Sequence, residues 1–178
     1  MEIYLVRHTS VNVPAGYAYG QTDVPLHPTF EKEAEAVKKT LSGHTFDKVW
    51  SSPLTRCTRL AAYCGYPDAE KEDRIKEISF GEWEMKSWDE LSSDPRSKAW
   101  FNDWINIPAP SGESLQDQYN RVSHFLDEIR RSSLQKVCLF THGGVLICAH
   151  VYAGKYDLKE AFRNVPSYGT VSYTHLTL

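Results

Sequence analysis

Short apolar runs alternate with segments of helical periodicity along this chain, and no other feature of the sequence constrains the fold as strongly. The apolar runs span residues 3–6, 46–50 and 136–141. The segments with helical periodicity span residues 30–41, 54–64 and 114–131, and residues 144–153 are predicted as a mostly apolar helix. Strands that alternate with helices form a mostly parallel sheet with helices on both faces. We therefore predict an α/β fold, a three-layer α/β/α sandwich around a mostly parallel central sheet.

Residues 82–112 interrupt the alternation and are rich in aromatic side chains. Four of the five tryptophans lie there: Trp83, Trp88, Trp100 and Trp104. A chain of 178 residues is long enough for one well-buried domain and short for two. We therefore predict a single domain over residues 1–178 with a small helical cap inserted at about 82–112. We expect most of these aromatic side chains to form the cap's own core and one or two to face a ligand.

The composition excludes several classes of partner. The net charge is −3 and the basic residues are scattered, so we expect no nucleic acid partner. The first apolar run ends at Arg7-His8 and no later run could span a bilayer, so we expect no signal peptide and no membrane partner. The four widely spaced cysteines fit free thiols in a reducing cytoplasm. A homodimer is kept as a hypothesis, because the sequence does not decide the oligomeric state.

Two histidines each follow a predicted strand. His8 comes directly after the first strand, and His142 comes directly after the third. Because parallel strands end at the same edge of a sheet, neighbouring strands would bring both imidazoles to one place. Arg7 adds positive charge there, Arg56 adds more from the helix after the second strand, and helix N-termini also favour anions. The combination predicts a phosphate pocket.

Each of these residues also has an ordinary structural explanation. A lone histidine at a strand end is more often a hydrogen-bonding residue than a catalyst, and a lone arginine is usually a surface charge. A metal site is the main functional alternative to a phosphate pocket. However, the sequence has no H-E-x-x-H motif, and arginines beside a cation would repel it. We therefore expect no metal and no other cofactor.

Five motifs in order resemble those of the histidine phosphatase superfamily, the group that contains the phosphoglycerate mutases. They are Leu5-Val6-Arg7-His8, Ser51-Ser52-Pro53-Leu54 with Arg56, Glu77-Ile78-Ser79-Phe80-Gly81-Glu82-Trp83-Glu84, Gly112-Glu113-Ser114 with Arg121, and Thr141-His142-Gly143-Gly144. The motifs cover nearly the whole chain, and five in order are far more specific than one. The resemblance implies a phosphoglycerate mutase-like fold.

The resemblance also implies a role for each candidate residue. His8 would be the nucleophile that forms a phosphohistidine, while Arg7, Arg56 and His142 would hold the phosphoryl oxygens. Glu77 corresponds to the general acid, which protonates the leaving alkoxide and then activates water.

Other residues of the motifs are secondary candidates or departures from the family pattern. Gln21 and Gly143 are candidate phosphate ligands at the edge of the pocket. Glu82 and Glu84 are rivals to Glu77, although a solvated charge is the better explanation of each. Met85 stands where the family frequently has glycine.

The short chain and its largely uncharged cap resemble the hydrolytic branch of the family rather than the longer mutases, which hold a second phosphate with extra basic segments. We therefore predict a phosphatase of a small-molecule phosphate monoester. The loop at residues 19–26 and the compact cap are similar to α-ribazole phosphatases of cobalamin biosynthesis, which makes α-ribazole 5'-phosphate a candidate substrate. The alternatives are a phosphoglycerate mutase, a phosphatase of sugar phosphates or other metabolites, and a non-catalytic module that binds a phosphorylated ligand.

Overall fold

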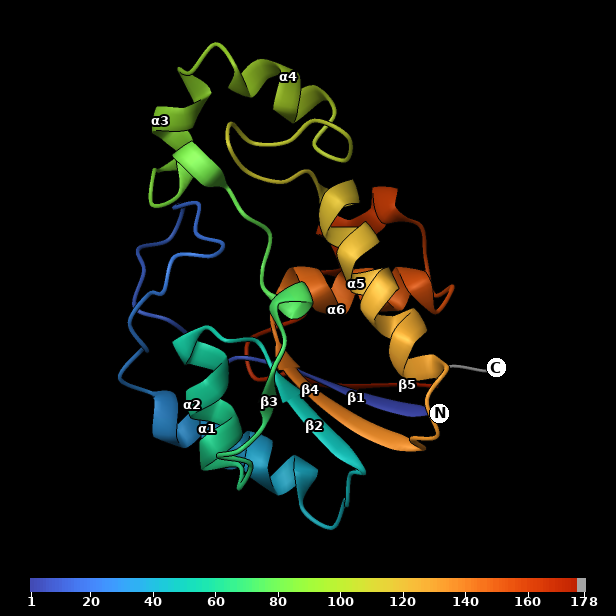
Figure 1. Cartoon of the computed structure of the whole chain (residues 1–178). Helices are drawn as coiled ribbons and strands as arrows, with labels where there is room; N and C mark the ends of the chain where they lie inside the picture. The colour runs from blue at the N-terminus through green and yellow to red at the C-terminus, as the bar shows by residue number, and fades with distance from the viewer. Residues whose placement is uncertain (176–178) are drawn as a thin grey trace.

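The computed structural model describes residues 1–175 and confirms an α/β fold with a mostly parallel sheet (Figure 1). The strands are β1 (Glu2–Arg7), β2 (Lys48–Ser51), β3 (Glu70–Lys71), β4 (Lys136–Thr141) and β5 (Val171–His175). They lie in the order β3-β2-β4-β1-β5, and β5 alone pairs antiparallel to its neighbour among these described strands. The three predicted strands are β1, β2 and β4, whereas both edge strands were missed.

Helices cover both faces of the sheet and complete the three layers. One face is covered by α1 (Phe30–Leu41) and α2 (Thr55–Tyr63), and the other by α5 (Leu115–Arg130) and α6 (Gly143–Tyr152). Along β4, Val137 and Leu139 pack with α5 and α6, whereas Cys138 and Phe140 pack with α1 and α2. Successive strand side chains point to opposite faces, so a continuous apolar run is buried on both. Within residues 1–175, no helix is long and apolar enough to cross a membrane.

Side-chain caps fix two of these helices near the candidate site. At the start of α5, the Ser114 hydroxyl accepts a hydrogen bond from the Asp117 N–H, and the Asp117 carboxylate accepts one from the Ser114 N–H. At the start of α2, the Asp23 carboxylate accepts from the backbone N–H of Thr55 at 2.9 Å. Asp23 therefore ties the loop between β1 and α1 to the helix that carries Arg56.

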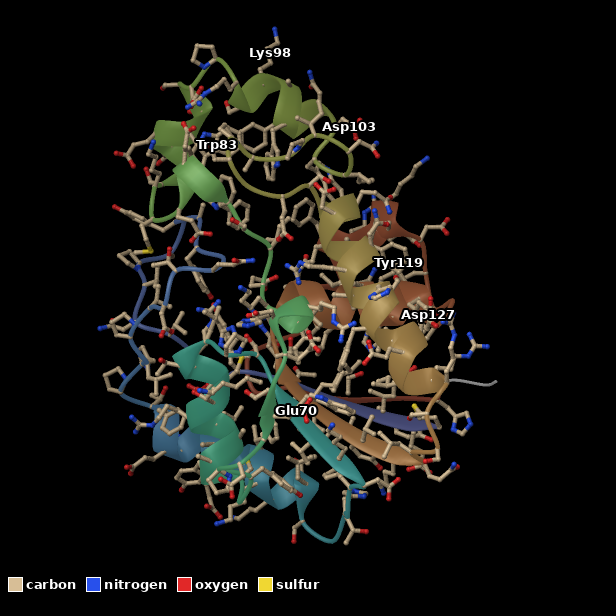
Figure 2. All side chains as sticks on the ribbon, viewed as in Figure 1. Glu70, Trp83, Lys98, Asp103, Tyr119 and Asp127 are labelled. Atoms are coloured by element: carbon tan, nitrogen blue, oxygen red, sulfur yellow. The ribbon has the colours of Figure 1, made fainter. Side chains whose placement is uncertain are left out.

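Residues 82–112 lie apart from the sheet and carry the short helices α3 (Trp88–Ser92) and α4 (Ser97–Asn102) (Figure 1). Trp83 and Trp100 belong to an apolar cluster of their own, against which Trp88 and Trp104 pack. Figure 2 shows Trp83 inside this segment and Lys98 pointing away from it. Trp83, Trp88 and Trp100 therefore pack mainly among themselves, as predicted, whereas Trp104 also packs against the core on the α5 and α6 face of the sheet.

Two glycines let the ends of this segment approach one another closely. The Glu113 N–H donates to the Ser79 carbonyl oxygen at 2.8 Å. A Cβ atom on Gly81 would collide with the carbonyl oxygen of Pro110, and one on Gly112 would collide with that of Ser79. Glycine at both positions is therefore a steric requirement of this crossing.

Candidate active site

The pairing of β1 with β4 brings the two predicted histidines together. The strands are in parallel register with Arg7 opposite Thr141, so His8 and His142 leave the sheet at the same edge. The centroids of their rings are 5.2 Å apart. Only 2% of His8 and 0% of His142 is exposed. The predicted convergence of the two imidazoles is therefore observed, and it lies inside the protein.

A backbone contact fixes the tautomer of His8. Its Nδ1 lies 2.7 Å from the carbonyl oxygen of Thr9. Because a carbonyl oxygen only accepts, Nδ1 carries the proton and Nε2 keeps its lone pair. Nε2 is therefore the nitrogen of His8 that can attack phosphorus.

Arg56 and Ser52 fix the second imidazole. Arg56 Nε donates to His142 Nδ1 at 3.3 Å, and therefore the neutral ring of His142 carries its proton on Nε2. This Nε2 lies 2.7 Å from the hydroxyl of Ser52. The sulfur of Cys57 is also near, at 3.5 Å, but burial raises the pKa of this thiol to about 12. Cys57 is therefore not a competing nucleophile.

The loop at residues 20–22 is held between a buried arginine and a carboxylate. Arg56 is completely buried and donates to two carbonyl oxygens of the loop, at 2.5 and 2.9 Å. On the other side, the Glu84 carboxylate accepts from the backbone N–H of all three loop residues. The interpretation of Glu84 as a solvated charge is therefore wrong. Glu82 is exposed and forms an ion pair with Arg96, as expected for a surface charge.

Arg7 is positioned by the chain segment that precedes β5. Its Nη1 donates to the carbonyl oxygen of Pro166, and its guanidinium carbon lies 4.1 Å from the centre of the Tyr168 ring. A Cβ atom on Gly143 would lie 3.2 Å from that carbon, so glycine leaves room for the group. Arg7 Nε is buried without a hydrogen-bond partner in the described residues, so this N–H is available to an anion.

Burial keeps both imidazoles uncharged. Desolvation lowers the pKa of His8 well below its usual 6.5, and the positive charge of Arg56 lowers it further against the opposing effect of the hydrogen bond to Thr9. Desolvation and Arg56 also lower the pKa of His142 well below that value. The neutral form of His8 keeps a free lone pair on Nε2, which a protonated imidazole lacks.

Three N–H groups hold the carboxylate of Glu77. Its Oε1 accepts from the Ile78 backbone at 2.9 Å and from Gln118 Nε2 at 2.9 Å, and its Oε2 accepts from the Gly144 backbone at 3.2 Å. Gln21 Nε2 donates to the backbone carbonyl of Glu77 at 3.1 Å. Gln21 is therefore next to the proposed acid, and its contact with phosphate stays a prediction.

Two polar residues of α5 support Glu77, and one of them was missed. The missed residue is Gln118, whose side chain is completely buried. In the sequence it is marked only as a polar residue at a position where the helical pattern calls for an apolar one. Arg121, known from the motif, donates to the Glu77 carbonyl at 3.0 Å and pairs with Glu113 at 2.7 Å. The i, i+3 spacing puts both side chains on one face of the helix.

A cavity of about 280 Å³ adjoins this cluster. Arg7, Glu77 and Gly143 contribute to its lining. Its aromatic lining consists of Tyr17, Tyr19, Phe80, Trp88, Trp100, Trp104, Phe162 and Tyr168. The hydroxyls of Tyr19 and Tyr168 are 2.5 Å apart, and the Tyr168 ring is 5.5 Å from that of His8. Both tyrosines therefore border the cavity, and Tyr168 also borders the buried imidazole of His8.

This arrangement of two imidazoles, two guanidinium groups and a carboxylate agrees with a sequence comparison. Residues 3–178 match the sequence model of the histidine phosphatase superfamily (branch 1). The chain belongs to the histidine phosphatase superfamily. It is therefore a phosphatase, as predicted.

Two curated relatives carry different names. The adenosylcobalamin/alpha-ribazole phosphatase of Salmonella typhimurium is 30% identical over 158 residues, which cover 82% of this chain and 76% of the relative. Phosphoserine phosphatase 1 of Hydrogenobacter thermophilus is 33% identical over 137 residues, which cover 74% of this chain and 65% of the relative.

Solved structures confirm the phosphoglycerate mutase-like fold. The α-ribazole phosphatase from Shigella flexneri superposes with a TM-score of 0.90 at 23% identity, covering 99% of this chain and 91% of the other. Phosphoglycerate mutase from Thermus thermophilus superposes with a TM-score of 0.77 at 30% identity, covering 97% of this chain and 92% of the other. One fold thus carries differently named enzymes.

The buried neutral histidines predict a loss of stability in mild acid. In the unfolded chain His8 and His142 take up protons near pH 6.5, whereas in the folded protein they stay neutral to a much lower pH. Unfolding therefore binds protons below pH 6.5, and the free energy of unfolding should fall by about 1.4 kcal/mol per pH unit for each histidine. Urea denaturation between pH 7 and pH 5 measures this slope. In the His8→Gln variant, the free energy of unfolding should depend less steeply on pH, because one histidine no longer contributes. An unchanged slope would contradict the conclusion that His8 is neutral in the folded protein.

Proposed function

We propose that this histidine phosphatase hydrolyses the phosphate monoester of a flat, largely apolar alcohol through a phosphohistidine at His8, with α-ribazole 5'-phosphate as the candidate substrate. One observation carries the proposal. The cavity that receives Arg7 and Glu77 continues into a wall of aromatic side chains. Such a cavity suits a phosphate at one end and a stacked ring system at the other.

The proposed reaction uses the residues that converge around His8. Its Nε2 attacks phosphorus while the ester P–O bond breaks. Arg7 and Arg56 neutralise the charge on the phosphoryl oxygens, and His142 helps to hold these oxygens by hydrogen bonding in its neutral form. Glu77 gives a proton to the leaving alkoxide. It then takes a proton from the water that attacks the phosphohistidine, which releases phosphate and restores His8.

The charges around the cavity favour this substrate class over phosphoserine and over a mutase reaction. Phosphoserine carries an ammonium and a carboxylate beside its ester, and a mutase must hold a second phosphate. Among the described residues that line the cavity, Arg7 is the only cation and Glu77 the only anion. Both act on the phosphoryl group or its leaving oxygen in the proposed reaction, so neither is available for further charges on the substrate.

The same proposal includes the organisation and location of the protein. Residues 82–112 would act as a cap on a single domain formed by residues 1–178, because Trp88 and Trp100 reach the cavity from this segment. Four free cysteines are compatible with a cytoplasmic location. The homodimer remains a hypothesis that light scattering of the purified protein would test.

Replacing the proposed nucleophile should abolish turnover. We expect His8→Ala to lower the hydrolysis of 4-nitrophenyl phosphate by at least about 10³-fold, because no other group can form the covalent intermediate. An acid-labile phosphoenzyme should be trapped in the wild type and absent from the variant. His124→Ala, at an exposed position on α5, is the matched control. Turnover that persists in His8→Ala would remove His8 from this role.

Replacing the proposed acid should matter most for poor leaving groups. We expect Glu77→Gln to lower kcat/KM for an alkyl phosphate by about 10²-fold or more and for 4-nitrophenyl phosphate by less than about tenfold, because a good leaving group needs little protonation. Glu82→Gln controls for the loss of a nearby charge. Equal losses for both substrates would count against Glu77 as the acid.

The substrate class is tested by comparing specificity constants. We expect kcat/KM for α-ribazole 5'-phosphate to exceed that for phosphoserine, phosphoglycerates and sugar phosphates. Trp88→Leu should lower kcat/KM for α-ribazole 5'-phosphate by about two- to tenfold, because stacking is lost, and should leave kcat/KM for phosphoserine unchanged. A preference for phosphoserine in the wild type would overturn the proposed substrate.

A further inference from the structure

Gln118 offers Glu77 both a donor and an acceptor. Its side chain is completely buried at the cavity, and its Nε2 donates to Glu77 Oε1 at 2.9 Å. Its own Oε1 is buried and has no hydrogen-bond partner in the described residues. A buried amide oxygen without a donor is unfavourable and requires an explanation.

The protonated form of Glu77 lacks an acceptor in the present arrangement. The backbone N–H groups of Ile78 and Gly144 donate to its oxygens and cannot accept. A carboxylic acid adds an O–H donor that needs a partner of its own. A half-turn of the Gln118 amide about its terminal torsion exchanges nitrogen for oxygen and supplies that acceptor.

The packing around Gly144 places both ends of the amide near the carboxylate. A Cβ atom on Gly144 would collide with Glu77 Oε1, and it would lie 2.7 Å from Gln118 Oε1 and 2.9 Å from Gln118 Nε2. The carboxylate and both amide atoms thus surround one point on Gly144. Glycine at this position is what allows the two side chains to meet.

The charged groups around Glu77 cannot accept the hydrogen bond from its protonated form. Arg121 of α5 holds its backbone carbonyl, and Arg7 of β1 lines the same cavity, but a guanidinium group has no acceptor. Glu113 is already bound to Arg121 and to the backbone N–H of Ser79. The amide oxygen of Gln118 is therefore the acceptor best placed for the acid.

We propose that Gln118 is a positioning residue that follows the proton of Glu77, with its amide nitrogen donating to the carboxylate and its amide oxygen accepting from the acid. The inference rests on the proposed role of Glu77. In the first step the Glu77 proton passes to the alkoxide oxygen as the ester P–O bond breaks and the bond from His8 Nε2 to phosphorus forms. The amide then turns its nitrogen to the new carboxylate.

In the second step the Gln118 amide turns back to its first orientation. The oxygen of water bonds to phosphorus, the N–P bond breaks, and a proton of that water passes to Glu77. Phosphate leaves, His8 is neutral again, and the amide oxygen of Gln118 accepts from the restored acid. The group therefore supports Glu77 both as acid and as base.

Three variants test the proposal. Gln118→Met keeps the length of the side chain and removes both polar ends, Gln118→Glu restores an acceptor, and Gln116→Met on the same helix is the matched control. We expect Gln118→Met to lower kcat/KM for an alkyl phosphate by about tenfold with KM unchanged. The same variant should change kcat/KM for 4-nitrophenyl phosphate by less than about twofold. At pH 6, Gln118→Glu should recover most of the alkyl activity, because adjacent carboxyl groups share a proton.

Two results would overturn this role. One is a loss in Gln118→Met that is equal for alkyl and aryl phosphates, which is the result expected of a purely structural residue. The other is a Gln118→Glu variant no more active than Gln118→Met. Melting temperatures check the fold, and Gln118→Leu replaces the methionine variant if that one does not fold. Failure of the acid assignment itself is distinguishable, because it would appear in Glu77→Gln.

Discussion

The buried guanidinium of Arg56 is the interaction on which the rest of the site depends. It holds the loop at residues 20–22, orients His142, and helps to keep both imidazoles neutral. Its hydrogen bonds within the described residues go to neutral acceptors, so no carboxylate compensates its charge directly. Burying such a charge is costly. In the proposed reaction a bound phosphoryl group would relieve this cost, and the stability of the site would then depend on anion binding.

The central part of the fold was predictable because its signals are local. Residues 137–140 are apolar, since both faces of β4 are buried, and α1, α2 and α5 show the 3.6-residue period of one buried face, whereas α6 is mostly apolar. The edge strands carry no such signal. β3 has two exposed residues, and β5 is mostly polar and buries Thr174. Their pairing depends on the sheet that is already present.

The candidate site was predictable where position along a strand or a motif determines it. His8 and His142 converge because each follows one of two adjacent parallel strands. The tautomer of His8 depends on local backbone geometry that no residue pattern encodes. The support from Gln118 depends on a contact with a distant segment, and a polar residue at an apolar helical position is its only signal in the sequence. Met85 is intermediate. The resemblance implied glycine at this position, and the φ of Met85 is 60°, in the left-handed region that favours glycine.

The crossing at Gly81 and Gly112 has a consequence for how this enzyme can evolve. A main-chain hydrogen bond between Glu113 and Ser79, together with the carboxylates of Glu113 and Glu84, holds the two ends of the segment between these glycines in place. The helices in between can therefore exchange residues without disturbing the chemistry below. Substitutions in α3 and α4 would therefore change which leaving group is accepted, while the residues proposed to transfer the phosphoryl group stay the same.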